Sequence, residues 1–534
     1  MTDSIQDQLR DYAHEVTSQS VSVDLDEIVS GRPLSQPVTQ TVGAWPEYPT
    51  EPSISIRRRG SLVAVASAVA VLLLVGGASL LLQMTGPDTP VAGTVVPTTL
   101  TEFTPTTVAE SELADLRGCE IPSGWLQVCD AASFDGTVMY AVAAGGPGLV
   151  AVGANGLEYY TRESHADLGG YEGEAPPGAG DAVVWTSPDG FTWTRVPHNV
   201  ATFGGDGGQQ MFGVTVGGPG LVAVGRDGPV ADGEGNAAVW TSPDGFTWSR
   251  VPHDEAIFGG QGEQRMVSVT AGGPGLVAVG FDKPAEQDEG NAAVWTSPDG
   301  FVWSRVPHDE AVFGGDSRQI MLSVITGGPG LVAVGTDGYS YRGDDDRFTE
   351  APDELAADAA VWTSPDGFTW SRVPHDEAIF GGQGEQRMVS VTAGGPGLVA
   401  VGSVTGEHQT GHYQKTDAAV WTSPDGFTWS RVPHDPAVFA TSSRGNRDWN
   451  ENMHSVTAGG PGLVAVGSDA GEQCGWDSAV WTSPDGFTWS RVPDLRFSSC
   501  DGFYDRMLSV TVGPSGLVAV GEEHPPGAAA VWNG

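Results

Sequence analysis

The chain has 534 residues and a net charge of −42, from 67 acidic and 25 basic side chains. So large an excess of negative charge argues against non-specific nucleic-acid binding, because the phosphates would be repelled. Glycine (76 residues) and proline (37 residues) are abundant, yet 17 tryptophans provide more aromatic surface than a disordered chain carries. The composition therefore favours many short strands joined by tight turns.

An apolar segment near the N-terminus divides the chain. Ser61–Leu82 holds 22 residues without a charge, which is long enough to cross the hydrocarbon core of a membrane. Arg57–Arg59 come directly before it, and the next basic residue is Arg117. By the positive-inside rule we expect one transmembrane helix over 61–83 in the cell membrane, with the N-terminus cytoplasmic and the C-terminal part extracytoplasmic. A secretory signal peptide is less favoured, because about 60 residues precede the apolar run.

Residues 1–60 and 84–118 flank this helix. The first segment is acidic, and we expect a cytoplasmic tail that is mostly disordered. The alternative is a short helix that docks a cytoplasmic partner, through hydrophobic residues at helical spacing: Ile5, Leu9, Tyr12 and Val16. The second segment is rich in Thr and Pro, which predicts an extended stalk.

The remaining residues, 119–534, repeat one unit seven times. The run GLVAVG starts at Gly148, Gly220, Gly275, Gly330, Gly397, Gly462 and Gly516. A Val-Trp pair follows in each unit, at Trp185, Trp240, Trp295, Trp362, Trp421, Trp481 and Trp532. Neighbouring tryptophans of this set are 51 to 67 positions apart. Such a period is typical of a propeller, a solenoid or an array.

Each unit divides into four strands. In the unit that begins at Arg265, the expected strands are Met266–Thr270, Leu276–Val279, Ala292–Thr296 and Phe301–Val306. The sequences Gly-Gly-Pro-Gly and Ser-Pro-Asp-Gly separate the first pair and the last pair, and both are turn sequences. Four antiparallel strands per unit predict the blade of a β-propeller.

The seventh unit ends soon after Trp532 and lacks a fourth strand. A matching segment lies at 124–136, where Trp125 and Val128 take the positions that Trp248 and Val251 hold in another unit. A strand from the N-terminus that completes the last blade would remove two sheet edges. We therefore predict an all-β, seven-bladed β-propeller over 119–534, closed by this N-terminal strand.

The turn before strand four reads Thr-Ser-Pro-Asp-Gly-Phe-Thr-Trp in five units, and a sixth copy has Val302 in place of Thr. It resembles the Asp-box repeat, Ser-x-Asp-x-Gly-x-Thr-Trp, with the Asp one place later than in the common form. Asp-box proteins include sialidases, other glycoside hydrolases, photosystem assembly factors and sorting-receptor ectodomains. The resemblance implies a structural role, joining strands three and four, for Asp189, Asp244, Asp299, Asp366, Asp425 and Asp485.

The resemblance makes a sialidase-like enzyme or another glycoside hydrolase one alternative function. A sialidase-like site needs three converging Arg, a Tyr–Glu pair and an Asp. The early Arg-containing motif of sialidases is absent, because Glu120–Pro122 lacks the Arg. We therefore predict no catalytic residue and favour a membrane-anchored scaffold that binds a glycan, a polymer or a protein. A structural envelope assembly factor is the third interpretation.

Recognition is expected in the long connections that differ between units, 154–181, 336–358 and 403–417. Candidate binding residues there are Tyr159, Tyr160, Arg162, Tyr339, Tyr341, Arg342 and Tyr413. Acidic clusters in these connections would suit Ca²⁺, and no other cofactor is predicted. We predict no metal site from histidines, since those of the repeated Arg-Val-Pro-His lie in separate blades and His408 with His412 lacks a third ligand.

All four cysteines, Cys119, Cys129, Cys474 and Cys500, follow the expected membrane span. An oxidising exterior would allow disulfides there. Their places in the repeat favour the pairs Cys119–Cys129 and Cys474–Cys500, with Cys129–Cys500 as the alternative and four free thiols as the remaining possibility.

Overall fold

The computed structural model describes residues 125–128, 134, 136–155, 180–205, 207–228, 235–260, 262–284, 290–315, 317–338, 357–382, 384–405, 416–440, 451–470, 476–493, 504–524 and 528–534. The chain divides into two units, Met1–Thr106 and Thr107–Gly534, and every described residue belongs to the second. The expected tail, transmembrane helix and stalk lie outside the described residues. Within the described ranges, no helix is long and apolar enough to cross a membrane.

Seven four-stranded antiparallel sheets follow one another along the chain. Blade 1 consists of β2 (Thr137–Gly145), β3 (Gly148–Asn155), β4 (Ala182–Ser187) and β5 (Thr194–Arg195). Blade 2 consists of β6 (Gly208–Gly217), β7 (Gly220–Gly228), β8 (Asn236–Ser242) and β9 (Ser249–Arg250). Blade 3 consists of β10 (Gly262–Gly272), β11 (Gly275–Pro284), β12 (Asn291–Ser297) and β13 (Ser304–Arg305). Blade 4 consists of β14 (Gln319–Gly327), β15 (Gly330–Asp337), β16 (Asp358–Ser364) and β17 (Ser371–Arg372).

The last three blades repeat the pattern. Blade 5 consists of β18 (Gln386–Gly394), β19 (Gly397–Thr405), β20 (Thr416–Ser423) and β21 (Ser430–Arg431). Blade 6 consists of β22 (Asn452–Gly459), β23 (Gly462–Ala470), β24 (Trp476–Ser483) and β25 (Ser490–Arg491). Blade 7 consists of β26 (Tyr504–Gly513), β27 (Gly516–His524), β28 (Ala528–Asn533) and β1 (Leu126–Gln127). One-turn helices follow blades 1, 3 and 5: α7 (Val200–Phe203), α8 (Glu310–Phe313) and α9 (Pro436–Phe439).

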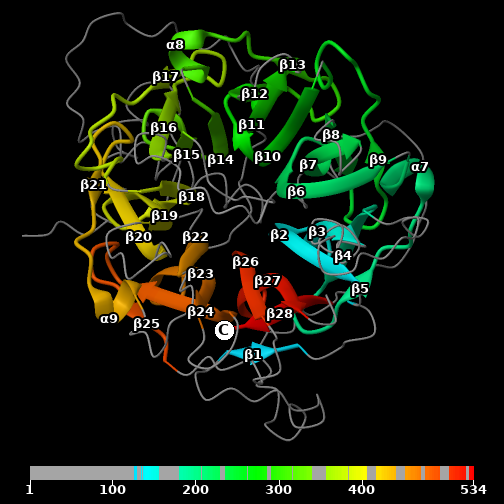
Figure 1. Ribbon diagram of the computed structural model, residues 1–534. Helices are drawn as coiled ribbons and strands as arrows, with labels where there is room; N and C mark the ends of the chain where they lie inside the picture. Colours follow the sequence, from blue (N-terminus) through cyan, green and yellow to red (C-terminus); the bar gives the residue numbers. More distant parts are fainter. Residues whose placement is uncertain are drawn as a thin grey trace, which may run out of the picture. The chain divides into compact units, whose positions relative to one another are not determined.

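The sheets form a ring of blades around a central axis, with the first strand of each blade innermost (Figure 1). Strand two is buried along most of its length, because a neighbouring blade packs on each face of its sheet. Each interface between neighbouring blades is filled by its own hydrophobic cluster, and one of the seven joins blade 7 to blade 1. The predicted seven-bladed propeller is confirmed.

Closure by the N-terminal strand is also confirmed. β1 pairs with β28 through Leu126 opposite Asn533 and Gln127 opposite Trp532, in sheet order β1-β28-β27-β26. The Val128 N–H then donates to Val531 O at 2.8 Å, as the Val251 N–H donates to Val239 O in blade 2. The first strand of the fold thus holds the last one, and no strand edge of blade 7 is left at β28.

Hydrogen bonds also join neighbouring blades on the inside of the ring, at five of the seven interfaces. Each inner strand has a β-bulge after its Met, for example between Met321 and Ser323 in β14. In blade 4 the Val324 N–H donates to Ser268 Oγ of blade 3, at 3.2 Å. The same bond joins blade 7 to blade 1, where the Val142 N–H donates to Ser509 Oγ at 3.2 Å. A backbone donor just after the bulge of one blade is therefore bound by a serine just after the bulge of the preceding blade.

Strand four is shorter than the sequence predicts. Of the expected strand Phe301–Val306, only Ser304–Arg305 forms a strand, β13, and the Val306 N–H adds one bond to Val294 O of β12 at 2.9 Å. The reason is that the N–H groups of Phe301 and Val302 both donate to Asp299 Oδ1, at 2.9 Å each. The Asp-box carboxylate takes these donors and delays the start of the strand until after Trp303.

We predict that Trp125→Ala destabilises the ring at its seam. Trp125 is 5% exposed, belongs to the cluster of Trp532, and packs so closely on the C-terminus that a Cβ on Gly534 would lie 2.4 Å from it. Loss of a buried Trp should lower the free energy of unfolding by about 3–5 kcal/mol, measured by denaturant unfolding. Phe427→Ala, at a side chain that is 54% exposed, is the control and should change it by less than about 0.5 kcal/mol. Equal unfolding midpoints for the two variants would show that closure depends on other contacts.

Candidate functional site

The ring has two ends that differ in chemistry. We call one the Asp-box end: it carries the turns between strands one and two and those between strands three and four. These turns touch across blades, since a Cβ on Gly218 of blade 2, where φ is +54°, would lie 2.7 Å from the Asp299 carbonyl oxygen of blade 3. We call the other the variable end: it carries the segments that join strand two to strand three and one blade to the next.

The Asp-box turns are held by their own side chains. In blade 2, Asp244 Oδ1 accepts the N–H groups of Thr247 at 2.7 Å and Phe246 at 2.9 Å. Ser242 Oγ accepts the Gly245 N–H at 2.8 Å, and Trp248 Nε1 donates to Gly245 O at 2.8 Å. The bonds from Thr247 and Phe246 hold the pKa of Asp244 below its usual value. The carboxylates of Asp189, Asp299, Asp366, Asp425 and Asp485 accept the same pair of backbone bonds.

At the variable end, a polar relay crosses three strands of a blade. In blade 3, Gln264 Nε2 of β10 donates to Asp282 Oδ1 of β11 at 2.9 Å. Arg305 of β13 donates to the other oxygen of Asp282, and its guanidinium lies 5.6 Å from the centre of the Trp295 ring. The relay repeats in blade 2, with Gln209, Asp227 and Arg250, and in blade 4, with Gln319, Asp337 and Arg372. These strand-four arginines are therefore bound within their own blades.

Blade 7 replaces all three members of this relay. Asp505 takes the position of the Gln, Glu523 that of the Asp, and Gln127 that of the Arg; Gln127 Nε2 donates to Glu523 Oε2 at 3.4 Å. Asp505 is 2% exposed, and burial, together with the charges of Glu523 and Asp477, raises its pKa to about 8. Burial raises the pKa of Glu523 as well, against a lowering by the Gln127 bond. Two acids thus share a position where blades 2, 3 and 4 pair one acid with one arginine.

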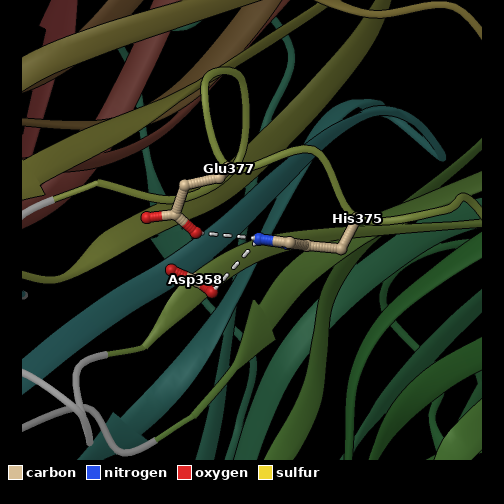
Figure 2. Close-up of side chains that lie close together, drawn as sticks. All are labelled: Asp358, His375 and Glu377. Atoms are coloured by element: carbon tan, nitrogen blue, oxygen red, sulfur yellow. Dashed lines mark hydrogen bonds and ion pairs between the residues drawn. The ribbon is translucent and has the colours of Figure 1, made fainter.

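A cluster with metal-ligand chemistry lies at the variable end of blade 4. It consists of Asp358, the first residue of β16, and of His375 and Glu377, which follow β17. Their ligand atoms all lie within 4.8 Å of one another. His375 Nε2 is 3.2 Å from Glu377 Oε2 and 3.7 Å from Asp358 Oδ2, and it points between the two carboxylates (Figure 2). We refer to these three residues as the blade 4 cluster.

Strand pairing explains the proximity of the blade 4 cluster. Strands three and four are antiparallel, and the Val373 N–H donates to Val361 O at 2.9 Å. Two residues further along the chain, beyond β17, His375 comes beside the start of β16, where Asp358 lies. Burial raises the pKa of Asp358 to about 6; His375 lowers it, whereas the charges of Glu377 and Asp337 raise it further. The ring of His375 lies 6.5 Å from that of Phe380, measured between centroids.

Five blades can be compared at these three positions. Blade 1 has Asp181, His198 and Val200; blade 2 has Asn236, His253 and Glu255; blade 3 has Asn291, His308 and Glu310; blade 5 has Asp417, His434 and Pro436. In the described blades 1 to 5, the combination Asp–His–Glu occurs in blade 4 alone. The sequence prediction compared histidines of separate blades and left out this set within one blade, which the predicted strand register could have indicated.

The candidate binding residues chosen from the sequence, Tyr159, Tyr160, Arg162, Tyr339, Tyr341, Arg342 and Tyr413, lie outside the described residues. The same holds for Cys119, Cys129, Cys474 and Cys500, and for His408 and His412. The ends of the connections that contain the seven binding candidates are described: they leave β3, β15 and β19 and return at β4, β16 and β20. Both ends of each connection lie at the variable end of the ring.

No protein-family model matches the chain, and no curated protein matches it. Among solved structures, a Trypanosoma rangeli sialidase in complex with 2,3-difluorosialic acid is 15% identical, with a TM-score of 0.35 over 61% of this chain and 55% of that one. A thermostable family-43 glycoside hydrolase is 12% identical, with a TM-score of 0.30 over 48% of this chain and 84% of that one. The PQQ domain of a pyranose dehydrogenase from Coprinopsis cinerea is 12% identical, with a TM-score of 0.30 over 61% and 92%. The chain thus spans just over half the length of the sialidase, and these likenesses concern the fold alone.

We predict that Asp505→Asn stabilises the propeller, and more so as the pH rises. A carboxyl group whose pKa is raised in the folded state does not lower the free energy of unfolding below its unfolded pKa of about 4. Above that pH the group lowers the free energy of unfolding progressively, until the pH reaches the folded pKa of about 8. The gain of the variant should therefore be near zero at pH 4 and reach roughly 1–3 kcal/mol at pH 8, measured by denaturant unfolding at pH 4, 6 and 8.

The matched control is Asp469→Asn in blade 6, where the carboxylate is paired with Arg491. Removing that negative charge should lower stability at pH 6 and 8. A gain for Asp505→Asn that does not change between pH 4 and pH 8 would contradict the assignment of a buried, protonated acid at the seam.

Proposed function

We propose that this protein is a membrane-anchored, extracytoplasmic β-propeller that acts as a binding scaffold for a glycan, a polymer or a protein. The observation that carries the proposal is the difference between the two ends of the ring. Six Asp-box turns repeat one self-contained set of hydrogen bonds, which we interpret as structural. The long connections between strands two and three all belong to the opposite end. Variable segments on a repetitive scaffold are where recognition usually occurs.

The relay at the variable end argues against a sialidase-like site built from the strand-four arginines. Three arginines must converge on one substrate carboxylate in such a site. Here Arg250, Arg305 and Arg372 each donate to an Asp of their own blade and lie over a Trp ring of that blade. Moving any of them toward the central axis would break an ion pair and leave an Asp carboxylate without its arginine, which costs free energy. These three strand-four arginines are therefore held within their own blades, which supports the scaffold as our proposal.

We predict that the connection between β15 and β16 contributes to recognition. Replacing residues 338–357 with residues 229–235 removes Tyr339, Tyr341 and Arg342. The grafted connection comes from blade 2, and the chain that follows it there (237–280) is identical to the chain that follows the connection in blade 4 (359–402). Binding to glycan and envelope-protein arrays should weaken at least about tenfold, while the melting temperature stays within about 2 °C.

The control for the graft is Phe368→Ala, a 55% exposed side chain at the Asp-box end, which should leave binding unchanged. Parallel incubation of the full chain with fluorogenic glycosides distinguishes a binder from a hydrolase. Turnover of any of these glycosides, or the absence of any ligand on both arrays, would contradict the scaffold.

The expected topology has a separate test. The proposal requires the propeller to lie outside the cell and the N-terminus inside, in line with Arg57–Arg59 before the apolar run. With a specific protease site inserted in the connection between β15 and β16, protease added to intact cells should cut the propeller and leave an N-terminal tag intact. Cutting that occurs only after the cells are permeabilised would refute this topology.

A further inference from the structure

The donors of the blade 4 cluster are one imidazole nitrogen and two carboxylates. This mixture of one N and two O ligands suits Zn²⁺ and neighbouring transition metals, whereas Ca²⁺ prefers six to eight oxygens. Three protein ligands around a tetrahedral ion leave a fourth position for water or another ligand. Glu377 is 73% exposed and His375 is 39% exposed, so that position would face solvent.

The spacing of the donors also agrees with an ion. Zn²⁺ bonds of about 2.0–2.2 Å in a tetrahedron place neighbouring ligand atoms roughly 3.3 Å apart. His375 Nε2 lies 3.2 Å from Glu377 Oε2 and 3.7 Å from Asp358 Oδ2. The imidazole nitrogen therefore already lies at nearly tetrahedral separations from both carboxylate oxygens. The ligand oxygens of the two carboxylates lie within 4.8 Å of each other, so all three ligand atoms face one small volume.

Charge favours a divalent cation at this place. With a neutral imidazole the cluster carries two negative charges, and Asp337 adds to the negative field at Asp358. Arg372, which also acts on Asp358, is bound by Asp337 in the relay of blade 4. A bound ion of charge +2 would neutralise the two carboxylates of the cluster. On these grounds we propose that Asp358, His375 and Glu377 bind a divalent transition-metal ion, with Zn²⁺ as the best match.

Blade 2 supplies a built-in comparison. It has the same His and Glu, in a stretch identical to that of blade 4, and His253 Nε2 lies 3.0 Å from Glu255 Oε2. The His253 ring packs on Phe258 with centroids 6.4 Å apart, as His375 packs on Phe380 at 6.5 Å. Asn236 stands where blade 4 has Asp358, so blade 2 lacks the second carboxylate. The chain thus contains the site and a nearly identical copy without its third charged ligand.

The experiment titrates Zn²⁺ into the metal-stripped full chain in detergent, in competition with a chromophoric chelator. Asp358→Asn, which copies blade 2, and His375→Gln should each remove one zinc site or weaken it at least about tenfold. His253→Gln should leave the number of sites unchanged. Asn236→Asp should add one site. The metal-free melting temperatures of all four variants check that each one is folded.

Two further measurements identify the ligands. Co²⁺ in place of Zn²⁺ should give visible absorption bands of a tetrahedral site that are lost in His375→Gln and kept in His253→Gln. Ca²⁺ should not compete for the site that depends on Asp358. Zinc binding that is the same in the original chain, Asp358→Asn and His375→Gln would overturn the proposal, as would an equal loss in His253→Gln.

Discussion

The ring depends on the contact between the buried tryptophan of strand three and the segment that arrives from the preceding blade. Hydrogen bonds of a sheet stay within its blade, so neighbouring blades are joined mainly through side chains and through the segments that connect them. Trp362 is fully buried, and its Nε1 donates at 2.7 Å to Val312 O in the segment arriving from the preceding blade. The same bond is made by Trp240, Trp295, Trp421 and Trp481. An indole combines a large apolar face with one directed donor, so this side chain both packs a blade and fixes the incoming chain.

This constraint separates stability from recognition along each strand. The Asp-box end satisfies its polar groups within single turns, and the buried middle fills the interfaces between blades. Only the variable end can accept insertions without disturbing the Asp-box turns or the interfaces between blades. Its connections leave strands whose pairing is already complete. The relay of Gln264, Asp282 and Arg305 marks the boundary, since it ties strands one, two and four together just below the connections.

Local patterns explain why the fold could be predicted from the sequence. Turn sequences define each strand pair, and one surplus copy of strand four at Trp125 reveals the closure. Such local patterns do not predict contacts between side chains on different strands. Asp282 and Arg305 meet only because both flank β12, and Asp358 meets His375 only through the register of β16 and β17. The short strand four escaped prediction for a related reason, as hydrophobic alternation does not show that Asp299 captures the N–H groups of Phe301 and Val302.

Departures from the repeat carry the specific chemistry, because near-identical blades share everything else. Blade 7 receives its fourth strand from the other end of the chain and has Gln127 where other blades have Arg, so its two acids have a neutral amide as their strand-four partner. A neutral amide offers N–H donors but no positive charge, and burial raises the pKa of Asp505 to about 8, which favours its protonated form at neutral pH. In blade 4 the departure lies at the surface, where the Glu377 side chain is 73% exposed. The same excess of carboxylate therefore favours a proton at the buried seam and a metal ion at the exposed cluster.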